Sequence, residues 1–185
     1  GNPQPPRFSF VNTHASLARE IHRIAHLTGT FKLRSGVTSH EYFDKYRFEA
    51  EPAVLKAIAE QLAAKLPPDF EVFAGLEMGG IPIAVMLSQV TGRPALFIRK
   101  KAKDYGTCQF AEGGSVSGRR LLIVEDVVTS GGQVVESVRA LRGEGAIISA
   151  VVCVIDRQAG GSEALAKEGL ALTSLFKKSD FNFSP

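Results

Sequence analysis

Hydrophobic positions recur along the chain with two different periods, which predict helices in some regions and strands in others. Near the N-terminus, apolar residues three and four apart predict a helix over residues 12–28. The same spacing predicts a second helix over residues 51–66, which Pro67-Pro68 ends. Between these helices, residues 31–48 mix short polar and aromatic segments without a regular period.

From residue 72 onward, short apolar runs alternate with amphipathic segments. The predicted strands are 72–76, 95–99, 121–124, 147–155 and 170–176, and the predicted helices are 81–90, 133–142 and 162–167. This alternation is typical of a parallel sheet with helices on both faces. Ligands of such sheets bind beyond the carboxyl ends of the strands, at the point where the strand order reverses. We find no internal repeat and no linker, so one α/β domain is expected.

Composition adds little to this picture. The 185 residues are 44% hydrophobic and 22% charged, which is ordinary for a soluble domain with a sizeable core. No apolar run approaches the length of a membrane span. Cys108 and Cys153 have neither a disulfide framework nor metal-ligand spacing, which predicts a reducing, cytoplasmic location. Residues 1–8 are expected to be flexible.

The most informative stretch runs from Leu121 to Gly132. Four aliphatic residues lead into Glu125-Asp126, and the loop Thr129-Ser130-Gly131-Gly132 precedes the predicted helix. The first N–H groups of a helix are unpaired and carry partial positive charge, so they bind phosphate. The two carboxylates accept hydrogen bonds from sugar hydroxyls. The combination suits a ribose 5-phosphate, whereas the plain alternative is a structural turn with two solvated acids.

This stretch resembles the signature of the type I phosphoribosyltransferases, which bind phosphoribosyl pyrophosphate (PRPP). The resemblance implies that the two acids hold the ribose hydroxyls and that the loop encloses the 5-phosphate. It also implies that Mg²⁺ is the cofactor, held mainly by PRPP and not by a metal site of the protein. The PRPP-binding residues expected here are Glu125, Asp126, Val127, Val128, Thr129, Ser130, Gly131, Gly132 and Gln133.

A second motif is the basic run that begins at Arg99, Arg-Lys-Lys-Ala-Lys-Asp-Tyr-Gly. Alone it would be a solvated loop, and the small residues that follow suit a mobile loop over residues 102–116. The run is similar to the Arg-Lys-x-x-Lys-x-His-Gly pattern of the orotate phosphoribosyltransferases, with Tyr105 in place of the His. This resemblance implies a homodimer in which the loop reaches the neighbouring active site. It assigns PRPP contacts to Arg99, Lys100, Lys103 and Tyr105, and catalytic roles to Arg99, Lys100, Lys103 and Asp126.

Two further segments are similar to the orotate-binding parts of that family. Residues 31–36, Phe-Lys-Leu-Arg-Ser-Gly, match the pattern Phe-x-Leu-Lys-Ser-Gly, with Arg34 in place of the Lys. Arg157 follows the strand predicted at 147–155, and an Arg fork binds a carboxylate with two parallel hydrogen bonds. An ordinary glycine-rich turn is the alternative for this Arg. The orotate-binding residues implied are Arg34, Ser35, Gly36, Thr129 and Arg157.

Two other features have simpler interpretations. Gly79 and Gly80 follow the strand predicted at 72–76, and the family places this turn at the diphosphate. His22 and His26 have zinc-like spacing on the first predicted helix, but no third ligand is evident, so a solvated helical face is expected.

The motifs together predict a type I phosphoribosyltransferase fold, with a small N-terminal hood in residues 9–48 and an α/β core in residues 49–185. The implied reaction of pyrimidine biosynthesis converts orotate and PRPP to orotidine 5-phosphate and pyrophosphate. A purine phosphoribosyltransferase is an alternative, although Arg157 and residues 34–36 argue against a neutral base. A second alternative is a regulator with this fold that binds RNA. The net charge of +3 permits RNA binding, but a polyphosphate ligand explains the basic cluster equally well.

Overall fold

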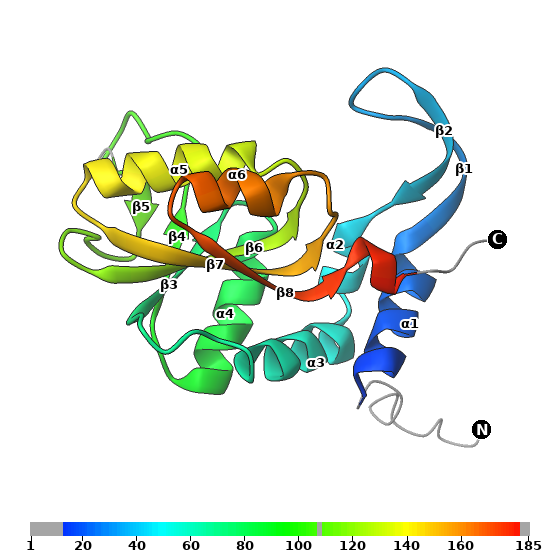
Figure 1. Ribbon diagram of the computed structural model, residues 1–185, viewed down its shortest axis with the longest axis horizontal. Helices are drawn as coiled ribbons and strands as arrows, with labels where there is room; N and C mark the ends of the chain where they lie inside the picture. The colour runs from blue at the N-terminus through cyan, green and yellow to red at the C-terminus, as the bar shows by residue number, and fades with distance from the viewer. Residues whose placement is uncertain (1–12, 107–108, 182–185) are drawn as a thin grey trace.

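Strand β6 (Arg120–Val128) lies inside a six-stranded sheet whose strand order is β5-β4-β3-β6-β7-β8 (Figure 1). This computed structural model describes residues 13–106 and 109–181. The predicted flexible end, residues 1–8, and Cys108 lie outside the described residues.

The sheet is parallel, as the sequence predicts, except at one edge, where the sequence predicts no strand. Its other strands are β3 (Val72–Leu76), β4 (Ala95–Ile98), β5 (Ala111–Glu112), β7 (Ile147–Asp156) and β8 (Ala171–Lys177). Only β5 is antiparallel to its neighbour. The chain passes from β3 to β4 on one side and returns to β6 on the other. The strand order therefore reverses between β3 and β6, and a ligand site is expected beyond their carboxyl ends.

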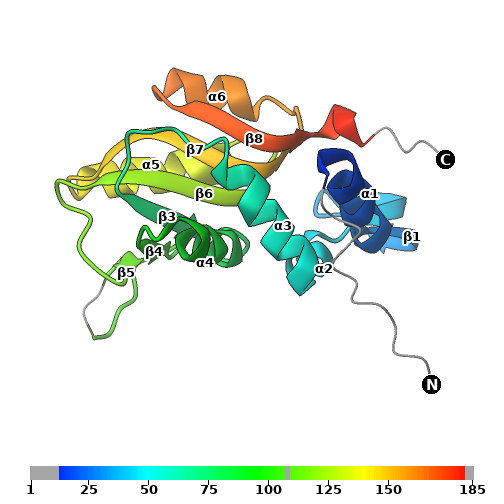
Figure 2. The ribbon, with the colours of Figure 1, turned by 90° about the horizontal axis from the view of Figure 1, so that it is seen from below.

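Helices cover both faces of the sheet (Figures 1 and 2). Helices α5 (Gly132–Gly143) and α6 (Gly161–Lys167) lie on one face, and α3 (Pro52–Ala63) and α4 (Gly80–Thr91) lie on the other. Alternate residues of β6 enter two separate clusters of buried side chains, with Leu122 on the α3–α4 side and Ile123 on the α5 side. A strand buried on both faces needs a continuous apolar run, which explains why the core strands are visible in the sequence.

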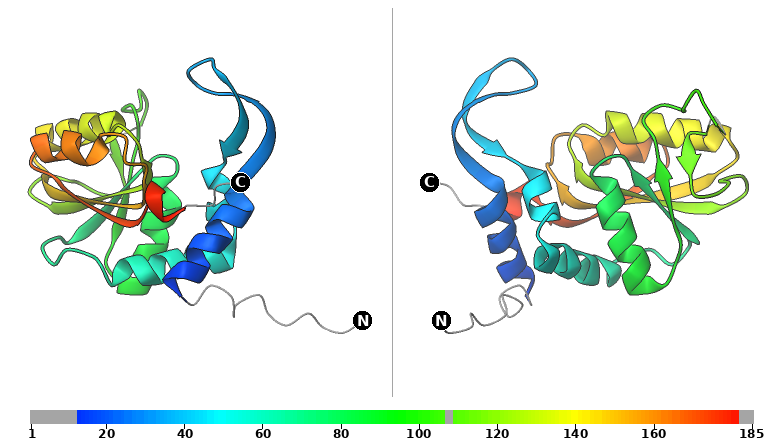
Figure 3. Two further views of the ribbon diagram at one scale, coloured as in Figure 1. Left: turned by 45° about the vertical axis from the view of Figure 1, so that its right-hand side comes forward. Right: turned by 180° about the vertical axis from the view of Figure 1, so that it is seen from behind.

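The N-terminal segment forms a hairpin beside the sheet (Figure 3). Helix α1 (His14–Ala25) leads into β1 (His26–Lys32), which pairs with β2 (Thr38–Phe43), and helix α2 (Lys45–Glu49) follows. The predicted helix over residues 12–28 is therefore wrong beyond Ala25. Because no side chain of β1 or β2 is buried, no apolar period marks these strands in the sequence.

Two other predicted boundaries change. Strand β6 continues to Val128, so the paired acids belong to the strand, and the predicted end at residue 124 is wrong. The extension exists because Val127 pairs with Ile155 of β7. The predicted loop over residues 102–116 contains β5, and the side chains of Ala111 and Val116 within it are buried. No described helix is long and apolar enough to cross a membrane.

Candidate active site

The sequence motifs lie at the carboxyl edge of the sheet, where the loop after β4 contacts the loop after β3 and the loop after β7 contacts the end of β6. The backbone N–H of Lys100, after β4, donates to Glu77 Oε1 of the loop after β3. The backbone N–H of Arg157, after β7, donates to the carbonyl of Val128 at the end of β6, at 2.9 Å. Motifs that are far apart in the sequence therefore line one continuous edge.

The loop after β6 has the predicted strand–loop–helix order. Thr129 and Ser130 are exposed, and Gly131 has a left-handed backbone with φ of 83°. Helix α5 begins at Gly132, and no side chain caps it. A helix start of this kind presents backbone N–H donors and positive partial charge to an anion.

Asp126 is completely buried and has a partner that the sequence does not reveal. Lys45 Nζ, from α2, lies 2.9 Å from Asp126 Oδ2 and 3.1 Å from Oδ1. The backbone N–H of Val127 donates to Oδ1 at 2.7 Å. Burial opposes ionisation of Asp126, but the contact with Glu49 and the charge of Lys45 outweigh it and lower the pKa of Asp126. Asp126 is therefore an anion paired with Lys45.

Glu49 lies next to Asp126 and is only 6% exposed. Burial, assisted by the hydrogen bond with Asp126 and by its charge, raises the pKa of Glu49 to about 10. Burial and the charge of Asp126 also raise the pKa of Glu125 well above its usual range. Of these three neighbouring carboxyls, Asp126 is the one whose pKa is lowered, and Glu49 is neutral at pH 7.

The raised pKa of Glu49 makes a prediction about stability. The folded state keeps the Glu49 proton between about pH 4.5 and 10, whereas the unfolded state releases it. Its contribution to stability is therefore complete at low pH and is lost as the pH rises through this window. Glu49→Gln removes this dependence. Between pH 6 and 8 we expect the unfolding free energy of the variant to rise relative to wild type by roughly 1 kcal/mol per pH unit. Urea titrations at several pH values measure the difference, and parallel pH curves would contradict the prediction.

The basic segment after β4 also has an unpredicted partner. Arg99 and Lys103 both contact Glu112 of β5, at 3.2 and 2.8 Å. The hydrogen bond from Lys103, and then the one from Arg99, lower the pKa of Glu112. Lys103 Nζ lies 5.7 Å from the ring centre of Tyr105, which is 66% exposed. Glu112 thus holds together two of the cations that the motif assigns to the diphosphate.

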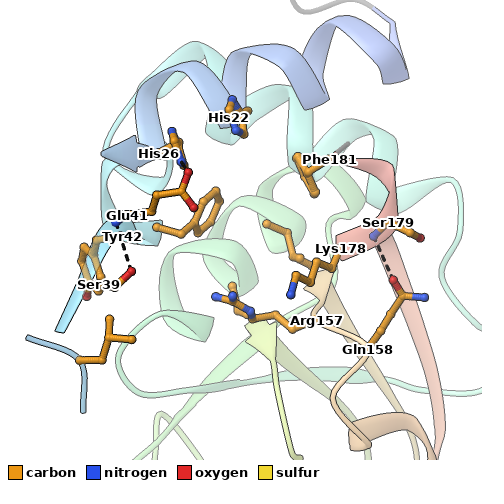
Figure 4. Close-up of a pocket in the computed structure, with 14 residues that line it drawn as sticks. His22, His26, Ser39, Glu41, Tyr42, Arg157, Gln158, Lys178, Ser179 and Phe181 are labelled. Atoms are coloured by element: carbon orange, nitrogen blue, oxygen red, sulfur yellow. Dashed lines mark hydrogen bonds and ion pairs between the residues drawn. The ribbon is translucent and has the colours of Figure 1, made fainter. Parts of the chain in front are cut away.

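A pocket of about 780 Å³ lies between the hairpin and the ends of β6 and β7 (Figure 4). Val127 lines it, and the side chains of Arg157 and Lys178 extend into the same part of it. Lys178 belongs to the 3-10 helix η2 (Lys178–Asp180) and is not part of any sequence motif. Among the described residues that line the pocket, Glu41 is the only acidic one, and it pairs with His26 at 3.3 Å. Arg157 and Lys178 are therefore not paired with an acidic residue of the pocket lining.

The other predicted orotate contacts do not line this pocket. Arg34, Ser35 and Gly36 form the exposed turn of the hairpin, where the N–H of Gly36 donates to Leu33. Thr129 lies in the loop after β6, outside the lining. Of the predicted orotate-binding residues, the pocket contains only Arg157.

His22 and His26 line the side of the pocket opposite Arg157 and Lys178. Their rings stack with centres 4.7 Å apart. His26 begins β1, so the predicted placement of both on one helix is wrong. Residues 13–106 and 109–181 contain no group of three or more side chains placed to hold a metal ion.

Comparisons with known proteins show the family of this chain. The family model of the phosphoribosyl transferase domain matches residues 46–182. The orotate phosphoribosyltransferase of a Nocardioides species is 49% identical over 168 residues, which are 91% of this chain and 94% of that protein. The Mycobacterium tuberculosis orotate phosphoribosyltransferase in complex with Fe(III) dicitrate superposes with a TM-score of 0.81 at 31% identity, covering 92% of this chain and 99% of that one. The same enzyme in complex with PRPP gives a TM-score of 0.76 at 30% identity and the same coverage.

The matched domain begins at Tyr46, after the hairpin, and extends over β3 to β8. The match to the Nocardioides protein covers nearly the whole length of both chains. The chain belongs to the phosphoribosyltransferase family and, within it, to the orotate phosphoribosyltransferases.

Proposed function

We propose that the chain transfers the 5-phosphoribosyl group of PRPP to orotate, forming orotidine 5-phosphate and releasing pyrophosphate. The bond between the anomeric carbon and the diphosphate oxygen breaks, and a bond from that carbon to a ring nitrogen of orotate forms. The nitrogen gives its proton to solvent. No protein nucleophile is needed, so catalysis rests on placing the two substrates and on stabilising the leaving group.

One observation supports this proposal above the others. Arg157, the cation suited to an anionic base, lies directly beside the end of β6, where the loop of residues 129–132 begins. The backbone of Arg157 is hydrogen-bonded to Val128, and Val127 lines the same pocket as Arg157. An anionic ring held by Arg157 would therefore lie next to a ribose held at the end of β6. A neutral purine would leave this Arg without an anion, which favours orotate.

The remaining roles follow from the motifs. Glu125 and Asp126 accept hydrogen bonds from the ribose hydroxyls, and residues 129–132 cradle the 5-phosphate. Asp126 is completely buried beside Lys45, so it must become accessible when PRPP binds. Lys100, Lys103 and Arg99 contact the diphosphate. Lys103 and Arg99 must leave Glu112 to do so.

Magnesium fits this edge of the sheet without a protein cage. Carboxylate oxygens suit Mg²⁺, but Asp126 is paired with Lys45 and the described residues contain no cluster of ligands. We propose that the diphosphate and the ribose hydroxyls of PRPP supply most of the ligands, with Glu125 nearby. When bound, the ion neutralises charge on the leaving diphosphate.

A spectrophotometric assay tests the proposal. Purified protein is mixed with orotate, PRPP and Mg²⁺, and the loss of orotate absorbance is followed. Turnover that stops when PRPP is omitted supports the reaction. A folded protein that binds PRPP without turnover would contradict it, and adenine, hypoxanthine and RNA would then be tested.

Arg157→Ala is expected to raise the KM for orotate about 10-fold, because a charge-assisted contact to the carboxylate is lost. The KM for PRPP should change little. Steady-state kinetics with each substrate varied in turn measure both values. Lys178→Ala is the matched comparison, since this cation lines the same pocket, and a smaller rise in the same KM is expected. A change in the KM for PRPP instead would place the base site elsewhere.

We further propose a cytoplasmic homodimer in which residues of the 102–116 segment reach the neighbouring active site. The exposed Tyr105 and the basic character of residues 99–103 support this role.

A further inference from the structure

We propose that Glu49 and Lys45 are positioning residues for Asp126, with Glu49 donating its carboxyl proton to Asp126 Oδ2 while Lys45 supplies the opposing charge. The inference rests on the proposed role of Asp126 as a ribose acceptor. Neither residue belongs to a phosphoribosyltransferase motif of the sequence, and both lie on the short helix that follows the hairpin.

The geometry requires a proton at this position. Glu49 Oε1, Glu49 Oε2 and Asp126 Oδ2 are buried, and none of them has a hydrogen-bond partner among the described residues. Lys45 Nζ lies 2.9 Å from Oδ2 as an ion pair, but its hydrogen bond goes to Oδ1. If both neighbouring carboxyls were ionised, the single ammonium of Lys45 would leave one negative charge unpaired in the interior, which is unfavourable. A proton on Glu49 satisfies both groups with one hydrogen bond.

The charges around Glu49 assign the proton to it and not to Asp126. Lys45 contacts both oxygens of Asp126, and the Val127 N–H adds a third donor to the same carboxylate. Glu49 receives no such donors. Asp126 is therefore the better anion, and Glu49 is the better acid.

This network connects three parts of the site. Helix α2 begins two residues after β2 of the hairpin, and its side chains hold Asp126 on β6. The same Oδ2 lies so close to Gly79, in the turn after β3, that an added Cβ on the glycine would lie 1.9 Å from it. The carboxylate is therefore contacted both from α2 and from the turn after β3.

Four variants test the proposal, with PRPP and Mg²⁺ titrated by calorimetry and with steady-state kinetics for both substrates. Glu49→Leu removes the donor and is expected to weaken PRPP binding about 10-fold, as for a lost hydrogen bond to a charged group. Glu49→Gln keeps a neutral donor and should restore binding to within about 3-fold of wild type. Lys45→Met, at a half-exposed position, should also weaken binding about 10-fold. Val54→Ala, on the buried face of α3, controls for general loss of stability.

The proposal holds if Glu49→Leu and Lys45→Met raise the KM for PRPP but not that for orotate, and if Glu49→Gln rescues binding. Equal behaviour of the Leu and Gln variants would overturn it, as would an equal loss in Val54→Ala. If Glu49→Leu does not fold, unchanged PRPP affinity of Lys45→Met still overturns it. A wild-type protein that fails to bind PRPP would instead refute the proposed function.

Discussion

Replacing Lys103 by alanine is expected to lower kcat about 10²-fold, equivalent to about 2.7 kcal/mol of transition-state stabilisation. The reason is that negative charge develops on the diphosphate as its bond to the anomeric carbon breaks. An ammonium held against that oxygen stabilises the transition state more than the ground state. Single-turnover and steady-state rates with saturating orotate and PRPP measure the effect.

Lys101→Ala is the matched control, because this Lys is exposed on the same segment and has no assigned contact. It should leave kcat within about 2-fold of wild type, in keeping with a surface charge. Since Lys103 also pairs with Glu112 at 2.8 Å, a loss in Lys103→Ala has a second explanation: Glu112 freed beside the diphosphate. The double variant Lys103→Ala/Glu112→Gln separates the two. Recovery of kcat in the double variant, or a near-normal kcat in Lys103→Ala, would remove Lys103 from the mechanism.

Gly80→Ala is expected to destabilise the fold by about 3 kcal/mol, the upper part of the range for overpacking. An added Cβ would lie 2.2 Å from the backbone oxygen of Val124, so α4 and β6 would have to separate. The separation would occur one residue before Glu125. We therefore expect weaker PRPP binding in addition to a lower midpoint in urea.

Gly143→Ala is the control for this variant. It lies in the last turn of α5, has no left-handed backbone and would place its Cβ in open space. This substitution should be neutral or stabilising by up to about 1 kcal/mol. Equal stability of the two alanine variants would mean that the start of α4 adjusts without cost.

The core of the fold could be predicted from the sequence because its buried parallel strands consist of short runs of apolar residues. The hairpin could not, since its two strands expose or half-expose every side chain and lack an apolar period. The end of β6 at Val128 could not be predicted either, because Glu125 and Asp126 are charged and charged residues indicate a loop. They lie in the strand because its pairing with β7 continues past them.

The candidate site also has a part that the sequence predicts and a part that it does not. Its motifs are local in sequence and could be found, but their partners are tertiary. Lys45 and Glu49, four residues apart, have the spacing of an ordinary surface pair on a helix. Only the tertiary fold brings both of them to Asp126. Glu112 contacts Lys103, and Lys178 lines the base pocket. Both residues lie outside the motifs, and no local sequence pattern identifies them.

The hairpin has a consequence for how the molecule opens. Its two strands form a sheet of their own, separate from the central one, and an isolated pair of strands is marginally stable. Amide hydrogens of β1 and β2 can therefore exchange with solvent by local opening, while those of β6 and β7 require unfolding of the whole domain. We therefore expect the hairpin wall of the base pocket to open more readily than β6, and the amides of β6 to be the better protected.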